Sequence, residues 1–170
     1  LTLHSYENRW QSWRAQMPAE TFAKVSSGSI HSLHMPSHYY YNRGDWDALI
    51  TINKNAWKKS KEQQVQLDLD DSMRAYHGYT WAIYAWLQQR KYEQAYEAIV
   101  DIIESAQSRR RDYYLAHVIA DFILQSPDGT PHRQDLIDMA FDISQTNAEN
   151  QTAYLFAQAW HAFESGNNDK

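Results

Sequence analysis

The chain has 170 residues, of which 43% are hydrophobic and 22% charged, and its formal net charge is −5 at pH 7. This size and composition suit one compact domain or a short array of helical units, and five Gly with four Pro exclude a linker or a low-complexity chain. A mildly acidic chain without a run of about 20 apolar residues predicts neither a membrane span nor nucleic-acid binding. The absence of Cys excludes disulfide frameworks, thiolate zinc sites and thiol catalysis.

Apolar residues recur with the helical period along the chain, and no run shows the alternation of a strand. The clearest example is the set Tyr79, Ala82, Ile83 and Trp86, which are spaced i, i+3, i+4, i+7. We therefore predict an all-α fold of about eight or nine helices. In chain order, the predicted helices span 5–16, 18–25, 30–42, 46–59, 75–89, 92–103, 112–124, 131–145 and 150–165.

Proline, glycine and acidic residues predict where the N-terminal helices end. Pro36 lies inside the predicted helix 30–42 and has no N–H to donate, so we expect a kink or a helix that restarts there. Gly44 ends that helix and Asp45 caps the next one. The polar stretch 60–68 is a connector or a helical extension, and it is followed by the candidate N-caps Asp70 and Asp71.

Short turns separate the C-terminal helices. Only Arg90 and Lys91 lie between two predicted helices, which favours an antiparallel pair. The segment 126–129, Ser-Pro-Asp-Gly, is a strong turn signal, after which Pro131 suits the first turn of a helix. Gly166 ends the last predicted helix.

Two segments, 44–50 and 90–96, share one pattern: a tight turn, an aromatic residue, and a small or apolar residue three positions later. This pattern resembles the tetratricopeptide repeat, and the resemblance covers most of the chain from Ile30 onward. It implies an α–α superhelix of antiparallel helix pairs. Leu49 stands where the repeat has Ala, and Arg90 stands where it has Gly. The spacing between the two segments also exceeds the standard repeat of about 34 residues, which marks 60–68 as an insertion.

The resemblance divides the chain into approximate helix pairs within a single domain, 1–170. The pairs are 5–25, 30–59, 72–106 and 110–145, with an unpaired last helix over 150–165. The chain begins at Leu1 rather than Met, so we expect a fragment of a longer chain or a removed leader.

A narrower resemblance lies in residues 34–38, which read His-Met-Pro-Ser-His, followed by the Gly44-Asp45-Trp46 turn. The segment is similar to an HMPSH motif in a group of bacterial tetratricopeptide-like proteins of poorly defined function. This second resemblance implies a fold and does not imply a chemistry.

In a tetratricopeptide array the first helix of each pair lines a concave groove. With the aromatic residue after each turn as the reference, five of the eight histidines fall on this face. The candidate groove residues are His31, His34, His38, Tyr41, His77, Tyr84, His117 and Asp121. The same register adds Thr80, Leu87, Tyr114, Ala153, Phe156, Trp160 and Phe163.

His34 and His38 have the i, i+4 spacing of two side chains on one helix face, and His31 adds a third at i, i+3. This spacing suits a metal or anion site. The alternative is that the imidazoles pack between helices and hydrogen-bond to tyrosines, and Pro36 disturbs the chelating geometry. There is no zinc-protease motif. We therefore predict no cofactor and no resident metal, with His34 and His38 as secondary metal candidates.

Aromatic residues make up 14% of the chain, and most of them fit a role as filling between paired helices. The segment 39–41 and the pair Trp81 and Trp86 also allow a binding platform, in which Tyr41 and Tyr84 are the residues assigned to the groove. The basic run 109–111 fits a solvated helix start better than a phosphate site. Ser37 and His38 are adjacent on a helix and point apart, so they do not form a nucleophile–base pair.

These observations predict a non-catalytic binding module that presents a His/Tyr-lined groove to a peptide or protein partner. The alternative is a small-ligand or metal-binding protein, or an enzyme, that uses the same cluster. The predicted last helix lacks a second helix against which to pack, so we expect an uncovered apolar patch at Phe156, Trp160 or Phe163. Self-association through that helix is a further predicted contact.

Overall fold

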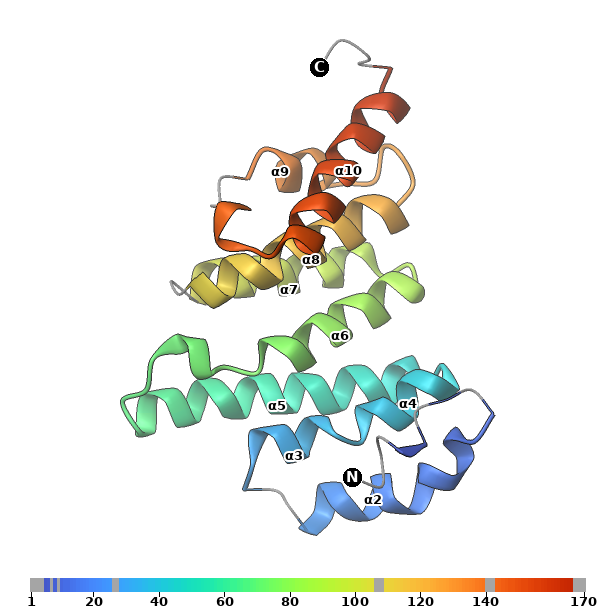
Figure 1. Cartoon of the computed structure of the whole chain (residues 1–170), viewed down its shortest axis with the longest axis vertical. Helices are drawn as coiled ribbons and strands as arrows, with labels where there is room; N and C mark the ends of the chain where they lie inside the picture. The colour runs from blue at the N-terminus through green and yellow to red at the C-terminus, as the bar shows by residue number, and fades with distance from the viewer. Residues whose placement is uncertain are drawn as a thin grey trace. The chain divides into compact units, whose positions relative to one another are not determined.

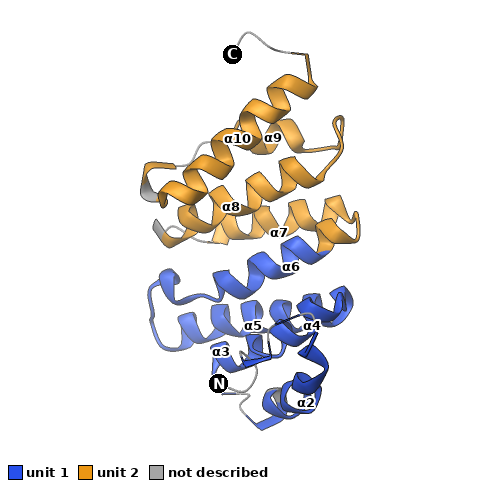
Figure 2. Cartoon of the chain, turned by 45° about the vertical axis from the view of Figure 1, so that its right-hand side comes forward, with its two compact units in different colours: residues 1–85 blue, residues 86–170 orange. Residues whose placement is uncertain are grey.

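The computed structural model describes residues 5–6, 8, 10–25, 28–105, 109–139 and 143–166, and its regular elements are helices (Figure 1). These residues contain no strand, which confirms the predicted all-α class. The chain divides into two compact units, residues 1–85 and 86–170 (Figure 2). Within the described ranges no helix has both the length and the apolarity needed to cross a membrane. The superhelical arrangement stays a prediction.

Unit 1 is organised along its longest helix, α5. Its elements are η1 (Ser12–Ala15), α2 (Gln16–Val25), α3 (Ile30–His34), α4 (Ser37–Arg43), α5 (Trp46–Gln66), η2 (Asp71–Met73) and most of α6 (Tyr76–Gln88). Both α3 and α4 pack against α5 (Figure 1). The polar stretch 60–68 continues α5 as far as Gln66, so the helical-extension alternative is confirmed in this region.

The break at Pro36 has the form expected from the sequence. α3 ends at His34 with Met35 as its C-cap, and α4 restarts with Pro36 as its N-cap. Gly44 then ends α4 in the left-handed conformation, with φ 68°. The Asp45 side chain accepts a hydrogen bond from the Ala48 amide at 3.2 Å and caps α5. The local chemistry of these few residues therefore sets the geometry of α3, α4 and the start of α5.

The core of unit 1 forms where α5 and α6 meet. Leu49, Ala56 and Trp57 of α5 are buried, as are Tyr76, Tyr79 and Ile83 of α6. The Trp57 and Tyr79 rings stack with centroids 4.6 Å apart. The far end of the contact is fixed by the Ser60 hydroxyl, which accepts a hydrogen bond from the Ala75 amide at 3.1 Å.

Unit 2 is centred on α8. Its elements are α7 (Tyr92–Ser105), α8 (Arg109–Gln125), α9 (Arg133–Ile137), η3 (Ile143–Gln145) and α10 (Ala148–Glu164). α8 contacts both α7 and α10, and it buries Leu115, Ile119, Phe122 and Ile123. Asn150 of α10 donates a hydrogen bond to the Tyr113 carbonyl at 2.9 Å, which fixes α10 on α8.

Two predicted helices are wrong. Among the described residues of the expected helix over 5–16, positions 6, 10 and 11 lie in turns and 12–15 form the short η1. The Asn8 side chain accepts hydrogen bonds from the amides of Trp10 and Gln11 and competes with helix formation. The expected helix over 131–145 ends at Ile137. His132 adopts the left-handed conformation, with φ 68°, and separates Pro131 from the helix that it was expected to begin.

Turn residues behave largely as predicted. Gly129 has φ 77° in the 126–129 turn, and Gly166 has φ 72° after α10. Arg90 also has a positive φ, 57°, at the position where the tetratricopeptide pattern has Gly. The Lys91 amide donates to the Trp86 carbonyl at 2.9 Å and closes that turn. Asp70 caps the short η2 through the Ser72 amide, rather than the helix that follows.

The predicted uncovered apolar patch on the last helix is confirmed in the described part of the chain. Leu155, Phe156, Trp160 and Phe163 of α10 are exposed, and Phe163 has 65% of its surface accessible. The Trp160 ring lies 5.9 Å from that of Phe163 and 6.5 Å from that of Phe156. The segment 167–170, which follows this helix, lies outside the described residues.

Candidate functional site

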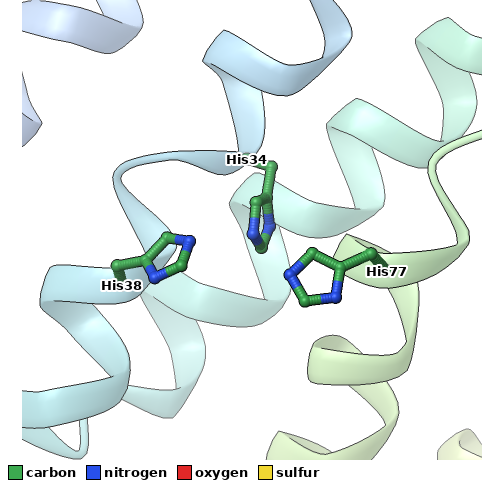
Figure 3. A group of neighbouring side chains, drawn as sticks. All are labelled: His34, His38 and His77. Atoms are coloured by element: carbon green, nitrogen blue, oxygen red, sulfur yellow. The ribbon is translucent and has the colours of Figure 1, made fainter. Parts of the chain in front are cut away.

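Three imidazoles meet in unit 1. His34 is the last residue of α3, His38 lies in the first turn of α4, and His77 lies in the first turn of α6. The His34 ring centroid is 4.9 Å from that of His38 and 4.8 Å from that of His77. Figure 3 shows His34 between the other two rings. One nitrogen from each ring lies within 4.8 Å of the other two.

The three residues differ in exposure. His34 and His38 are buried, whereas His77 is exposed. His31, which the sequence placed beside them, is also exposed, and its ring centroid is 6.3 Å from that of His34. His31 is not part of the group of three converging nitrogens. The cluster is therefore accessible to solvent on the side of His77 and closed on the side of α5.

A hydrogen bond from α5 fixes the orientation of His34. The Nδ1 atom of His34 lies 2.7 Å from Oδ1 of Asn53, and the Asn53 amide group donates to the Leu49 carbonyl at 3.1 Å. Because an amide oxygen only accepts, His34 Nδ1 carries the proton and donates. The hydroxyl oxygen of Ser37 lies 3.1 Å from the same nitrogen. In its neutral form His34 therefore has its lone pair on Nε2.

Gly78 makes this arrangement possible. A Cβ atom at this position would lie 2.7 Å from Oδ1 of Asn53 and 2.9 Å from Nδ1 of His34, well inside normal contact distance. Only a residue without a side chain lets the backbone of α6 lie this close to the pair. Gly78 is buried within a helix, where glycine is otherwise unfavourable by about 1 kcal/mol.

We expect Gly78→Ala to lower the free energy of unfolding by about 1–2 kcal/mol, because the clash with His34 and Asn53 outweighs the better helix propensity of alanine. Urea unfolding followed by circular dichroism measures the change. Gly28→Ala is the matched control, because a Cβ at Gly28 has no neighbour within 4 Å. Equal stability of the two variants would show that the side chains of His34 and Asn53 shift to accommodate the new methyl group without a loss of stability.

Trp81 of α6 lies against all three imidazoles. Its ring centroid is 4.6 Å from that of His38, 5.1 Å from that of His34 and 5.3 Å from that of His77. An indole at this distance keeps water from one side of the cluster and limits the rotation of the rings. The sequence analysis left Trp81 either as filling between helices or as part of a binding platform, and its place next to the histidines was missed.

The aromatic contacts continue from Trp81 along α6. The Tyr41 ring centroid lies 5.1 Å from that of Trp81 and 5.6 Å from that of Tyr84. Trp46 lies 5.9 Å from Tyr41 and 6.0 Å from Tyr84. Tyr41 is 39% exposed, and the other three rings are partly exposed. We call Tyr41, Trp46, Trp81 and Tyr84 the ring cluster.

The remaining predicted groove residues are placed differently. His117 and Asp121 belong to unit 2, where Nε2 of His117 lies 3.4 Å from Oδ2 of Asp121 on α8. Burial raises the pKa of the Asp121 carboxyl above its ordinary value, while His117 acts in the opposite direction. Thr80 and Leu87, which the register assigned to the groove, are buried. In the basic run, Arg111 pairs with the adjacent Asp112 at 2.8 Å.

Unit 2 has a cavity of about 390 Å³ between α9 and α10, which the sequence did not indicate. Its walls include Gln134, Asp138, Leu155 and His161. His161 Nε2 lies 3.0 Å from Oε1 of Gln134, and His161 Nδ1 is buried without a hydrogen-bond partner. The described residues that line it include one imidazole and one carboxylate, whereas three imidazoles meet in unit 1, so the histidine cluster of unit 1 is the stronger candidate site.

The sequence identified His34, His38 and His77 as candidate groove residues, but not the residue of α5 that orients His34. Asn53 is a buried polar residue in an otherwise apolar face of α5, between Leu49 and Ala56. A polar residue in an apolar stripe is a signal for a buried hydrogen bond. That signal does not reveal the partner, because His34 lies on another helix.

Comparison of the chain with protein-family models, with curated proteins and with solved structures found no match. The functional assignment therefore depends on the geometry of the site itself.

Proposed function

We propose that this protein is a non-catalytic, tetratricopeptide-like binding module, and that the ring cluster of unit 1 is where it holds a peptide segment of a partner protein. One observation supports the proposal above the others. The Tyr41 ring from the end of α4 meets Trp81 and Tyr84 of α6, and all three rings keep part of their surface accessible.

The packing of these rings favours binding. Each ring contacts at least one other ring of the cluster, so its rotation is already restricted before a ligand arrives. Binding to a restricted side chain loses less conformational entropy, which is a main cost of association. Tyrosine and tryptophan also combine a large apolar face with one polar group, and they are enriched at the centres of protein interfaces.

The chemistry of the cluster indicates an extended segment with an apolar side chain. A proline or aromatic ring of the partner stacks on Tyr41 and Tyr84, and tyrosine hydroxyls supply hydrogen bonds to its backbone. Aromatic-lined surfaces recognise proline-containing segments in this way. The exposed imidazole of His77, whose ring centroid lies 5.3 Å from that of Trp81, supplies a further polar contact beside the rings.

Selection of a displayed random-peptide library on the intact chain tests the proposal. We expect one enriched class of peptides, whose affinity falls at least ten-fold in Tyr41→Ser and in Tyr84→Ser, measured by fluorescence anisotropy. Ten-fold corresponds to about 1.4 kcal/mol, within the range of an interface hot spot.

Tyr113→Ser is the matched control, because Tyr113 is a comparably exposed tyrosine on α8 of unit 2. Its substitution should leave the affinity unchanged. The proposal fails if no peptide class is enriched, or if the three variants bind the selected peptides equally well.

A further inference from the structure

The geometry points to a second property that goes beyond peptide binding and does not depend on it: His34, His38 and His77 form a binding site for one divalent transition-metal ion, Zn²⁺ in particular. The sequence suggested only the first two of these residues as secondary candidates. The third residue, His77, comes from α6 and completes a set of three potential ligands.

The nature of the ligands selects the class of metal. Neutral imidazoles bind Zn²⁺, Cu²⁺, Ni²⁺ and Co²⁺ well, whereas Mg²⁺ and Ca²⁺ prefer oxygen ligands. Three protein nitrogens are also the set that leaves a fourth tetrahedral position for water or another ligand. The exposure of His77 places that open side toward solvent.

The orientation of His34 is the one that metal sites use. Metal-ligating histidines donate their second ring N–H to a carbonyl or carboxylate oxygen, which fixes the tautomer and the ring plane. In His34 the Nδ1–H donates to Asn53 Oδ1 at 2.7 Å, and Asn53 is itself fixed by its bond to Leu49. This leaves Nε2 as the atom that can bind an ion. The close approach of Gly78 keeps α6 against this pair.

Zinc binding requires the three ring nitrogens to lie closer together than they do here. Two nitrogens that share a tetrahedral Zn²⁺ at about 2.0 Å lie about 3.3 Å apart, whereas the three nitrogens here lie within 4.8 Å of one another. His77 is exposed and has the most room to move, whereas His34 and His38 are buried. Trp81 packs against all three rings and forms an apolar wall beside the ion.

Titration of the intact, untagged chain with ZnCl₂ in a calorimeter tests the inference, with no peptide present. We expect one Zn²⁺ per chain and a rise in Tm with zinc, since an ion that binds only the folded state stabilises it. Co²⁺ should give the intense visible absorption of a four-coordinate nitrogen site. Affinity should fall as the pH is lowered from about 7.5 to about 5.5, because protonated imidazoles do not bind metal.

His77→Gln is the main variant, because His77 is exposed and its loss should leave the fold intact. We expect it to weaken zinc binding at least ten-fold and to remove the Co²⁺ absorption. His31→Gln is the matched control: it changes a neighbouring exposed histidine that lies outside the group of three nitrogens. It should bind zinc like the parent chain.

Two results would overturn the inference: no heat of zinc binding and no change in Tm at millimolar zinc, or His77→Gln and His31→Gln variants that bind zinc equally well. The outcome is separable from that of the proposed function. Loss of peptide binding in Tyr41→Ser leaves the three imidazoles in place, and failure to bind zinc leaves the ring cluster in place.

Discussion

Replacing Trp57 with alanine is expected to lower the free energy of unfolding by about 3–5 kcal/mol, the range found when a large aromatic side chain is removed from a protein core. Trp57 is 3% exposed, and its ring is stacked on that of Tyr79 with an angle of 5° between the planes. The same ring lies 5.3 Å from that of Tyr76. Removal of the indole therefore leaves a cavity at the contact between α5 and α6.

Urea unfolding followed by near-UV circular dichroism measures this loss. Trp57→Phe is the control, because a phenyl ring still packs on Tyr79, and we expect it to recover more than half of the stability. If the alanine variant stays within about 1 kcal/mol of the parent chain, the α5–α6 contact is not the main support of unit 1. In the expected case zinc binding should also weaken, because α6 carries His77 and α5 carries the residue that orients His34.

In unit 2, Arg133→Ala is expected to lower the free energy of unfolding by about 2–4 kcal/mol. Arg133 is 2% exposed, and its guanidinium donates to the Glu164 carboxylate at 2.5 Å and to the Ile123 carbonyl at 2.8 Å. It thus links α9, α10 and the end of α8. Alanine leaves a cavity where the long side chain packed, and it leaves the Ile123 carbonyl without this donor.

Arg133→Met separates packing from hydrogen bonding, because methionine keeps much of the volume of arginine and none of its donors. We expect this variant to lower the free energy of unfolding, but by less than Arg133→Ala does. Glu164→Gln should cost less than Arg133→Ala, since the side chain of residue 164 is only partly buried and the amide oxygen still accepts. Chemical denaturation of all three variants provides the comparison. An Arg133→Ala variant as stable as the parent chain would contradict the role assigned to this residue.

Much of the helical structure could be predicted from the sequence, because it depends on residues that are close in the chain. The restart at Pro36, the end of α4 at Gly44 and the cap at Asp45 follow from single side chains or from a missing N–H. The two wrong helices show the limit of this reasoning. Hydrogen bonds from backbone amides to the Asn8 side chain, and the left-handed conformation of His132, each put a turn where a helix was predicted. Neither feature has a strong sequence signal.

The candidate site could be predicted only in part. Helical spacing placed His34 and His38 together, and they remain neighbours even though Pro36 interrupts the helix between them. The tetratricopeptide register added His77 and Tyr84 to the same face, and the structure brings both near the residues of α3 and α4. The roles of Asn53 and Gly78 had no counterpart in the sequence analysis, which named Trp81 as part of a possible binding platform but not as a neighbour of the histidines.

The sequence by itself determined the helical class of this protein and most of its turns, and it showed that imidazole and aromatic groups are frequent in the first half of the chain. Tertiary structure alone decided that three imidazoles converge, which of the nitrogens of His34 is protonated, and that His117 and Asp121 pair with each other in unit 2. The physical reason is that helix periodicity and capping act over four or five residues. The side chains that meet at the histidine cluster come from three helices. The packing of α3 and α4 against α5, and the ring contacts of α6 with Trp57 and with His34, set the distances between them.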